Sequence, residues 1–283
     1  MDYVKPVDSA KNMLEFAAAK AALPVSDFLI RGFLSGAILG FATTVAFTAT
    51  KQTSVPLVGA LVFPTGFILI ILLGLELVTG NFALLPVGLQ AGRITVQQVL
   101  ANFGWVFLGN LLGSLFYGYL LNVTLSYSGI SQASIAPALV AAAEAKTIGY
   151  AQHGMAGMVA CVIKAVLCNW MVCVATIAPM GSTSATGKIF AAWIPIFIFF
   201  SLGFEHSVVN LFLIPTGMML GAKVNIADWW LWNQIPVTIG NLLGGWLLIG
   251  LPMYLTYGRR SAAGGPATEI QHDGQAAFVT AKR

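Results

Sequence analysis

The sequence predicts an all-α membrane protein with six transmembrane helices, arranged as a 3+3 inverted repeat in which helices 2 and 5 are broken. Three observations predict this fold. Of the 283 residues, 58% are hydrophobic and only 8% are charged, whereas a soluble domain carries roughly 25% charged residues. Apolar runs of membrane-spanning length occur along most of the chain. Polar motifs within these runs recur in the two halves at a nearly constant offset.

The expected spans follow from length, because a crossing helix needs about 20 mostly apolar residues. They fall near residues 27–50, 56–90, 97–124, 153–178, 189–220 and 229–257. The second and fifth are too long for one straight crossing, and polar clusters interrupt them at 76–81 and 205–210. Prolines flank both clusters, at Pro64 and Pro86 in the second span and at Pro195 and Pro215 in the fifth. This pattern predicts broken helices.

The two halves, about residues 17–128 and 129–258, repeat one another. The matched residues are Lys20 with Lys146, Glu76 with Glu205, Asn81 with Asn210, Pro86 with Pro215 and Asn110 with Asn241. The difference in residue number is nearly the same in all of these pairs. Each half holds an odd number of spans, so the second half must cross the membrane in the opposite direction. Matching helix breaks in inverted repeats indicate a site near the midplane of the bilayer.

The distribution of basic residues predicts the orientation. With both termini in the cytoplasm, the inner segments hold ten Lys and Arg residues and the outer loops hold three, Lys51, Lys146 and Lys223. Residues 1–26 are then a cytoplasmic segment with an amphipathic helix over 9–23, for which Ser9 is the expected cap. Residues 27–258 form the membrane domain, and 259–283 form a disordered cytoplasmic tail.

Several other functions lack the residues that they need. The net charge of +4 comes without a basic patch, so nucleic acid is not an expected partner. No nucleotide-binding loop or cluster of metal ligands is present, which argues against an enzyme and against a metal or other cofactor. The three cysteines show no metal or redox spacing and are interpreted as small core residues.

Four motifs carry a resemblance to a known family. They are GLELVTGN (74–81), LCNWMV (167–172), GFEHSVVN (203–210) and IPVTIGNLLGG (235–245). Together they resemble the formate/nitrite transporter family over about residues 10–258. The resemblance implies a homopentamer in the cell membrane, with a pore through each protomer and an aquaporin-like helical arrangement. Aquaporins themselves are excluded because the sequence contains no Asn-Pro-Ala.

The candidate pore residues centre on His206, which is the histidine expected at membrane depth. An ionisable residue there suggests function, since a neutral imidazole can donate a hydrogen bond to an anion or exchange a proton with it. The resemblance implies that Thr79 lies opposite His206 and that Asn241 also reaches this centre. The expected supports of the helix breaks, which satisfy freed backbone groups, are Glu76, Asn81, Glu205, Asn210, Asn110 and Asn169.

The mouths and walls of the pore complete the candidate site. Lys20 and Lys146 precede the first span of each half, where a positive potential would gather anions. Lys146 lies farther before Asn169 than the family spacing implies, so Lys164 is an alternative at the outer mouth. By motif alignment, the two apolar constrictions of the family correspond to Phe63, Phe67, Leu77, Val172 and Phe199.

The expected substrate is a small monovalent anion, and overall resemblance favours formate. Nitrite, hydrosulfide or another weak-acid anion is the alternative. A neutral solute such as ammonia is a third reading, which the lysines disfavour because they would repel ammonium. Dehydrating an anion in a dry ring costs several kcal/mol. Protonating formate at pH 7, if its pKa is about that of an aspartate (3.9), costs roughly 4 kcal/mol. Because these costs are comparable, anion channel and proton-coupled transport both stay open.

Overall fold

The computed structural model describes residues 2–127 and 135–259, and this part of the chain is built from helices. In chain order the helices are α1 (Pro6–Ala21), α2 (Val25–Thr53), α3 (Pro56–Val62), α4 (Pro64–Leu72), α5 (Val78–Gln90), α6 (Val96–Ser126), α7 (Ala136–Ala145), α8 (Ile148–Ala151), α9 (Gly154–Ile177), α10 (Ala185–Ser201), α11 (Ser207–Met219), α12 (Ile226–Trp229), α13 (Ile235–Gly245) and α14 (Leu251–Met253). A 3₁₀ turn, Ala178–Gly181, follows α9, and π-helical turns join α12, α13 and α14 into one continuous helix. The predicted tail lies, except for Arg259, outside the described residues.

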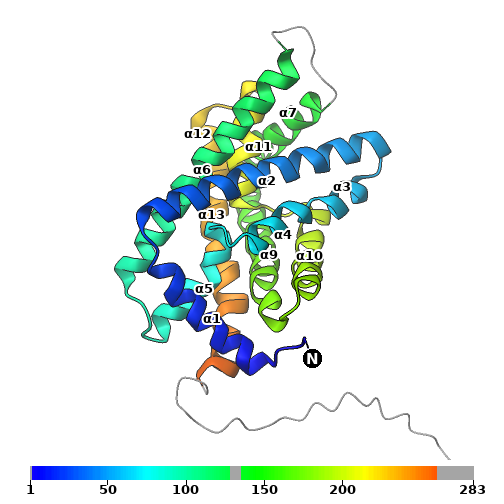
Figure 1. The fold of residues 1–283 in the computed structure, drawn as a ribbon. Coiled ribbons are helices and arrows are strands. Elements are labelled where there is room, and N and C mark those ends of the chain that lie inside the picture. The colour runs from blue at the N-terminus through cyan, green and yellow to red at the C-terminus, as the bar shows by residue number, and fades with distance from the viewer. Residues whose placement is uncertain (1, 128–134, 260–283) are drawn as a thin grey trace, which may run out of the picture.

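Within the described part of the chain, four helical segments are long and apolar enough to cross a membrane. They are Val25–Thr53, Val96–Ser126, Gly154–Gly181 and Ile226–Gly258. These segments coincide with four of the predicted spans. The two interrupted spans form shorter helices, Pro56–Leu72 with α5 in the first half and α10 with α11 in the second. Figure 1 shows α2 crossing the middle of the molecule, with α6 beside it.

The breaks in the two interrupted spans occur at equivalent glycines. The helical path stops after α4 and resumes at α5, and it stops after α10 and resumes at α11. Gly74 and Gly203, which are related by the same offset as Glu76 and Glu205, both have a φ of +63° in these turns. A positive φ is accessible to glycine at little cost. The polar clusters therefore indicated the breaks correctly.

The prolines mark the breaks less well than predicted. Pro86 lies inside α5, Pro215 inside α11 and Pro195 inside α10, so the chain stays helical through all three. Neighbouring helices in a membrane protein satisfy the backbone groups that a proline frees, which explains this tolerance. Pro64 alone stands at an interruption, the narrow boundary between α3 and α4.

A shorter helix stands before the first long span of each half. The first, α1, packs against α5 through Met13, Leu14 and Ala17, and the second, α7, packs against α11. Figure 1 places α1 and α7 at opposite ends of the molecule. The expected cap at Ser9 is wrong, because α1 begins three residues earlier at Pro6 and buries Ser9 within the helix. Proline is favoured at a first helical position because its missing N–H would be unpaired there.

Candidate functional site

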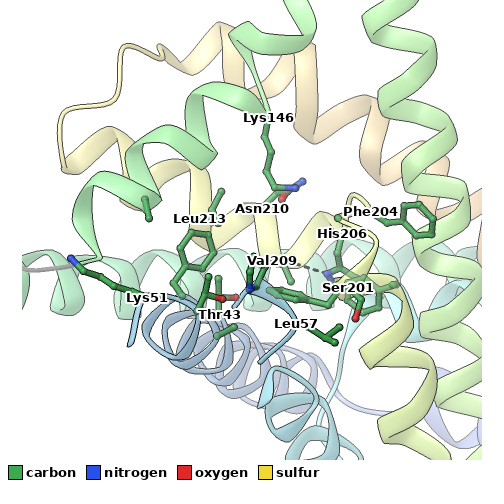
Figure 2. Close-up of a pocket in the computed structure, with 18 of the residues that line it drawn as sticks. Thr43, Lys51, Leu57, Lys146, Ser201, Phe204, His206, Val209, Asn210 and Leu213 are labelled. Atoms are coloured by element: carbon green, nitrogen blue, oxygen red, sulfur yellow. Dashed lines mark hydrogen bonds between the residues drawn. The ribbon is translucent and has the colours of Figure 1, made fainter. Parts of the chain in front are cut away.

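Two cavities approach the helix breaks, and each contains one of the matched lysines. The Lys146 cavity has a volume of about 780 Å³ and is also lined by His206 and Asn210 (Figure 2). The Lys20 cavity has a volume of about 680 Å³ and is also lined by Glu76. Apolar side chains supply much of both walls, including Phe199 in the first and Ile70 in the second. The two cavities therefore present both helix breaks to small solutes.

His206 stands at the start of α11, where both of its ring nitrogens have protein partners. The Nδ1 atom accepts the backbone N–H of Val209 at 3.1 Å and so caps the helix. A neutral ring that accepts at Nδ1 carries its proton on Nε2. The Nε2 atom lies 3.0 Å from Thr79 Oγ1, so Nε2–H donates to the threonine oxygen. The predicted neighbours His206 and Thr79 are thus in direct contact, although they belong to different halves of the chain.

Asn169 holds the backbone behind this contact. Its Nδ2 donates to the carbonyl of Thr79 at 3.1 Å and to the carbonyl of Asn241 at 2.6 Å. The Sγ of Cys173 also donates to the Thr79 carbonyl, at 3.3 Å. Because α9 carries both Asn169 and Cys173, this helix fixes the start of α5 relative to α13. Asn169 is therefore a support for Thr79 as well as for the break.

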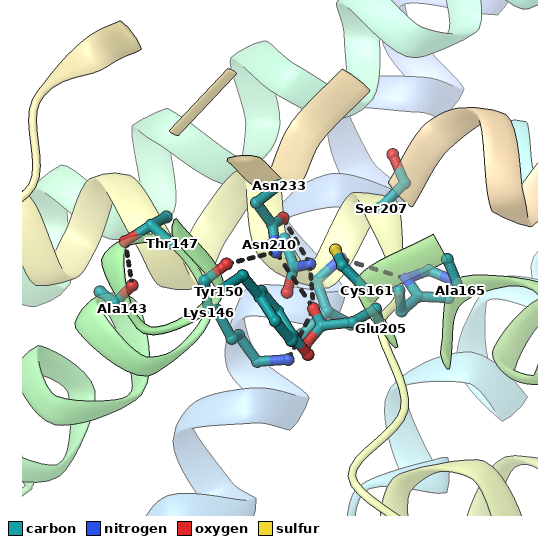
Figure 3. Close-up of polar contacts among 12 residues, drawn as sticks. Ala143, Lys146, Thr147, Tyr150, Cys161, Ala165, Glu205, Ser207, Asn210 and Asn233 are labelled. Carbon is teal, nitrogen blue, oxygen red and sulfur yellow. Dashed lines mark hydrogen bonds and ion pairs between the residues drawn. The ribbon is translucent and has the colours of Figure 1, made fainter. Parts of the chain in front are cut away.

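The carboxylate of Glu205 is the centre of a buried polar network (Figure 3). Lys146 pairs with it at 2.9 Å, Tyr150 donates to it at 2.8 Å, and Asn210 donates to it at 2.8 Å. Asn233 donates both to this carboxylate and to the Lys146 carbonyl. Burial and the nearby Glu205 raise the pKa of Tyr150, which keeps its hydroxyl a donor. Four donors around one buried carboxylate offset its loss of hydration.

The first half contains the same arrangement in simpler form. Lys20 pairs with Glu76 at 2.6 Å, and Asn81 donates to the other oxygen of that carboxylate at 2.8 Å. Asn81 also donates to Asn102 at 2.9 Å, and Asn102 donates to the Lys20 carbonyl at 3.4 Å. The sequence analysis matched a lysine, a glutamate and an asparagine of one half with the same residue types in the other. Within each half, these three residues make equivalent contacts.

Asn102 and Asn233 were missed by the sequence analysis. They are related by the same offset as Asn110 and Asn241, and each stands in an apolar span outside the recognised motifs. The same offset search, applied to single polar residues rather than to motifs, would have found them. Each closes its network by joining the asparagine of the break to the backbone near the lysine.

Asn110 and Asn241 cap the helices that follow the breaks. Asn110 Oδ1 accepts the N–H of Val78 at 3.1 Å, and Asn241 Oδ1 accepts the N–H of Ser207 at 2.8 Å. The amide of Asn241 donates to the carbonyls of Ala165 and Glu205. These contacts make Asn241 a support of the break. That its side chain also reaches the central pair stays a prediction.

The structure distinguishes the two lysines considered for the outer mouth. Lys146 lines the cavity that contains His206, whereas Lys164 is absent from that lining. The Lys164 ammonium lies 5.6 Å from the centre of the Tyr150 ring, in a cation–π contact. The segment between Lys146 and Asn169 includes α8, which supplies Tyr150. Through Tyr150 this helix extends the network around Glu205.

The aromatic residues assigned to the constrictions are buried in one apolar cluster. Phe199 lines the Lys146 cavity, and its ring stacks on that of His206 with 5.7 Å between centroids. Phe63 contacts the edge of Phe199 at 5.8 Å and stacks on Phe200 at 3.9 Å. The remaining constriction residues, Phe67, Leu77 and Val172, belong to the same cluster and line neither cavity. Phe199 thus joins the apolar cluster to the histidine.

The arrangement can offer a substrate hydrogen bonds and positive charge, with little covalent reactivity. Within residues 2–127 and 135–259, no group of His, Cys, Asp or Glu side chains could hold a metal ion. The exchangeable donors near the helix breaks include His206 Nε2–H, the Thr79 hydroxyl and the two lysine ammonium groups. Such a set suits the recognition of a small anion or acid and its passage.

Comparison with known proteins gives consistent matches over most of the chain. A sequence model of the formate/nitrite transporter family matches residues 7–255. A probable formate transporter of Methanothermobacter thermautotrophicus is 35% identical over 273 residues, covering 90% of this chain and 97% of that protein. The formate channel FocA of Haemophilus influenzae is 32% identical over 283 residues, covering 89% and 94%.

Solved structures support the same grouping. An FNT family ion channel superposes with a TM-score of 0.74 at 27% identity, covering 88% of this chain and 98% of that one. A pentameric formate channel with formate bound has the same fold, with a TM-score of 0.67 at 24% identity over 82% and 97%. The helical fold and these matches define an integral membrane transport protein rather than an enzyme. The chain belongs to the formate/nitrite transporter family.

Proposed function

We propose that the protein is a channel for small monovalent acid anions, with formate as its preferred substrate. The contact between His206 and Thr79 carries this proposal, because it joins the two helix breaks at a histidine that lines the Lys146 cavity. An anion that arrives there meets Nε2–H and a hydroxyl, two donors suited to a carboxylate. The relatives described as formate transporters or channels support the choice of formate.

The proposed assembly follows the predicted topology. The chain crosses the membrane six times as two inverted halves, with an aquaporin-like arrangement and both termini in the cytoplasm. The equivalent networks of Glu76 and Glu205 support this symmetry. The pentameric state of the solved formate channel supports a homopentamer with one pore in each protomer. In this orientation the Lys146 cavity opens to the outside and the Lys20 cavity to the cytoplasm.

The proposed passage includes an apolar region that an anion crosses with a partial loss of water. Phe199 covers one face of the His206 ring, so a solute that reaches the histidine is shielded on that side from bulk solvent. An anion there loses hydration, and a proton shared with the imidazole lowers that cost. His206 is therefore assigned the role of hydrogen-bond donor and proton-exchange partner, and Thr79 the role of its oriented neighbour.

Flux measurements in proteoliposomes test the proposal. Purified protein is reconstituted, and the entry of formate, nitrite, hydrosulfide and ammonia is compared with that in protein-free liposomes. Formate should enter fastest, and His206→Asn should alter its dependence on pH. Faster nitrite or hydrosulfide entry would reassign the preferred anion. Ammonia entry without anion entry would overturn the proposal.

A further inference from the structure

The cations that line the two cavities differ in their local neutralisation. Lys146 and Lys20 each pair with a buried glutamate, as described above. Arg31, which also lines the Lys20 cavity, pairs with Asp27 at 2.6 Å. Each of these three cations therefore stands beside a carboxylate that cancels most of its long-range field. Lys51, at the Lys146 cavity, has an interaction within the protein as well.

Lys188 is different. It lines the Lys20 cavity and is half-buried near the start of α10. In the described part of the chain its ammonium forms no ion pair and no hydrogen bond. A cation near a helix N-terminus is electrostatically unfavourable for that helix, and the first turn of α10 contains no acidic residue. The helix itself therefore gives no reason for a lysine at this position.

The repeat gives no reason for a lysine at position 188 either. At the offset that relates Gly74 to Gly203, the position equivalent to Lys188 is Gly59, so the matched framework of the two halves contains no second copy of this cation. Lys188 thus adds to the wall of the Lys20 cavity a positive charge that no carboxylate of the described residues neutralises. A positive potential in a cavity with low-dielectric walls raises the local concentration of anions.

We propose that Lys188 recruits the anion in the Lys20 cavity and so raises the apparent affinity of the channel at that face alone. The inference deepens the proposed function and depends on it. Lys188 would attract the substrate at the mouth and release it toward the helix breaks, because an ammonium that remains partly in water holds an anion weakly. Its removal should raise the KM for anions that enter through the Lys20 cavity. The maximal rate should stay nearly unchanged, since that rate is set farther inside.

Right-side-out and inside-out membrane vesicles test this proposal, because they expose opposite cavities to the bath. In Lys188→Gln, the KM for formate should rise about 10-fold at low ionic strength in one vesicle type and stay unchanged in the other. The increase should shrink toward 1 M salt, where the Debye length is about 3 Å. Lys188→Arg keeps the charge and should restore the wild-type KM. Arg93→Gln is the matched control, because Arg93 is an exposed cation that does not line the cavity.

The outcomes distinguish a failure of the role of Lys188 from a failure of the proposed channel function. An unchanged KM in both vesicle types, or an equal increase in both, would overturn the role of Lys188. So would a Lys188→Arg variant that behaves like Lys188→Gln, or an Arg93→Gln variant that reproduces the effect. A wild-type channel that moves formate no faster than vesicles without it would instead overturn the proposed function. A retained maximal rate in Lys188→Gln shows that the variant is folded.

Discussion

At the scale of single residues, His206 makes two contacts with the same ring, one that caps a helix and one that reaches the other half of the chain. Its Nδ1 caps α11, and this bond leaves Nε2–H directed at Thr79. The helix cap therefore selects the tautomer that faces the other half of the molecule. An anion that binds Nε2–H must compete with the Thr79 hydroxyl. Weak, exchangeable binding follows from that competition and suits a channel better than a tight site does.

We predict that His206→Asn folds but loses part of its pH response. Asparagine is among the best N-cap residues, so the cap on Val209 is retained and the stability should change by about 1 kcal/mol or less. An amide cannot take up a proton in place of the imidazole. Formate uptake measured between pH 4 and 8 should therefore become flatter than in the wild type, while thermal unfolding stays similar. Identical pH profiles would reduce His206 to a capping residue.

A second residue-scale prediction concerns Lys146. Its ammonium neutralises the buried Glu205, so Lys146→Met should leave an uncompensated carboxylate and lower the free energy of unfolding by about 3–5 kcal/mol. The double variant Lys146→Met/Glu205→Gln should recover most of that loss, because no buried charge remains. Thermal unfolding of both variants in detergent checks this. A loss confined to flux, which fades as salt is added, would instead support a role in gathering anions.

At the scale of helices, the sequence predicted that the helices exist, and that two of them are broken, better than it predicted where they begin and end. A polar cluster inside an apolar run is costly in a membrane, so it marked both breaks. Prolines were poor markers because packed neighbours tolerate them within α5, α10 and α11. The helix α7 lies between recognised motifs and was not predicted. The Asn102 and Asn233 contacts depend on tertiary approach, which an isolated asparagine in an apolar span does not reveal.

The glycines of the breaks lead to a prediction at this scale. Alanine at Gly74 or Gly203 would meet no atom within 4 Å, so any cost comes from the backbone φ of +63° alone. A left-handed conformation costs a residue with a Cβ roughly 1–2 kcal/mol, and each variant should lose about that much stability. Gly104→Ala in α6 is the control, because its Cβ also meets no atom and its backbone is helical. Equal stabilities of all three variants in thermal unfolding would contradict the strained-turn interpretation.

At the scale of the whole molecule, two cavities reach the region of the helix breaks, and the buried apolar cluster lies beside the His206–Thr79 contact. The supporting networks hold the breaks at fixed positions, which keeps helix N-termini and capping side chains directed at one region. Selectivity among anions should then depend on the width of the opening between the apolar side chains rather than on tight binding of the anion. Phe199 is the residue that tests this, because it belongs both to the wall of the Lys146 cavity and to the cluster.

Phe199→Ala should remove the ring that covers His206, admit water and let acetate and lactate pass faster relative to formate. Truncating a buried phenylalanine also costs about 3–5 kcal/mol, so lowered stability alone decides nothing. Phe212→Ala supplies the matched control, because Phe212 is equally buried in α11 and lines neither cavity. Uptake of formate, acetate and lactate is measured beside the melting temperature of the purified oligomer. Both variants should melt earlier, but only Phe199→Ala should change the ratio of the three rates. The same ratio in both variants would make Phe199 a packing residue and move the selective step away from the Lys146 cavity.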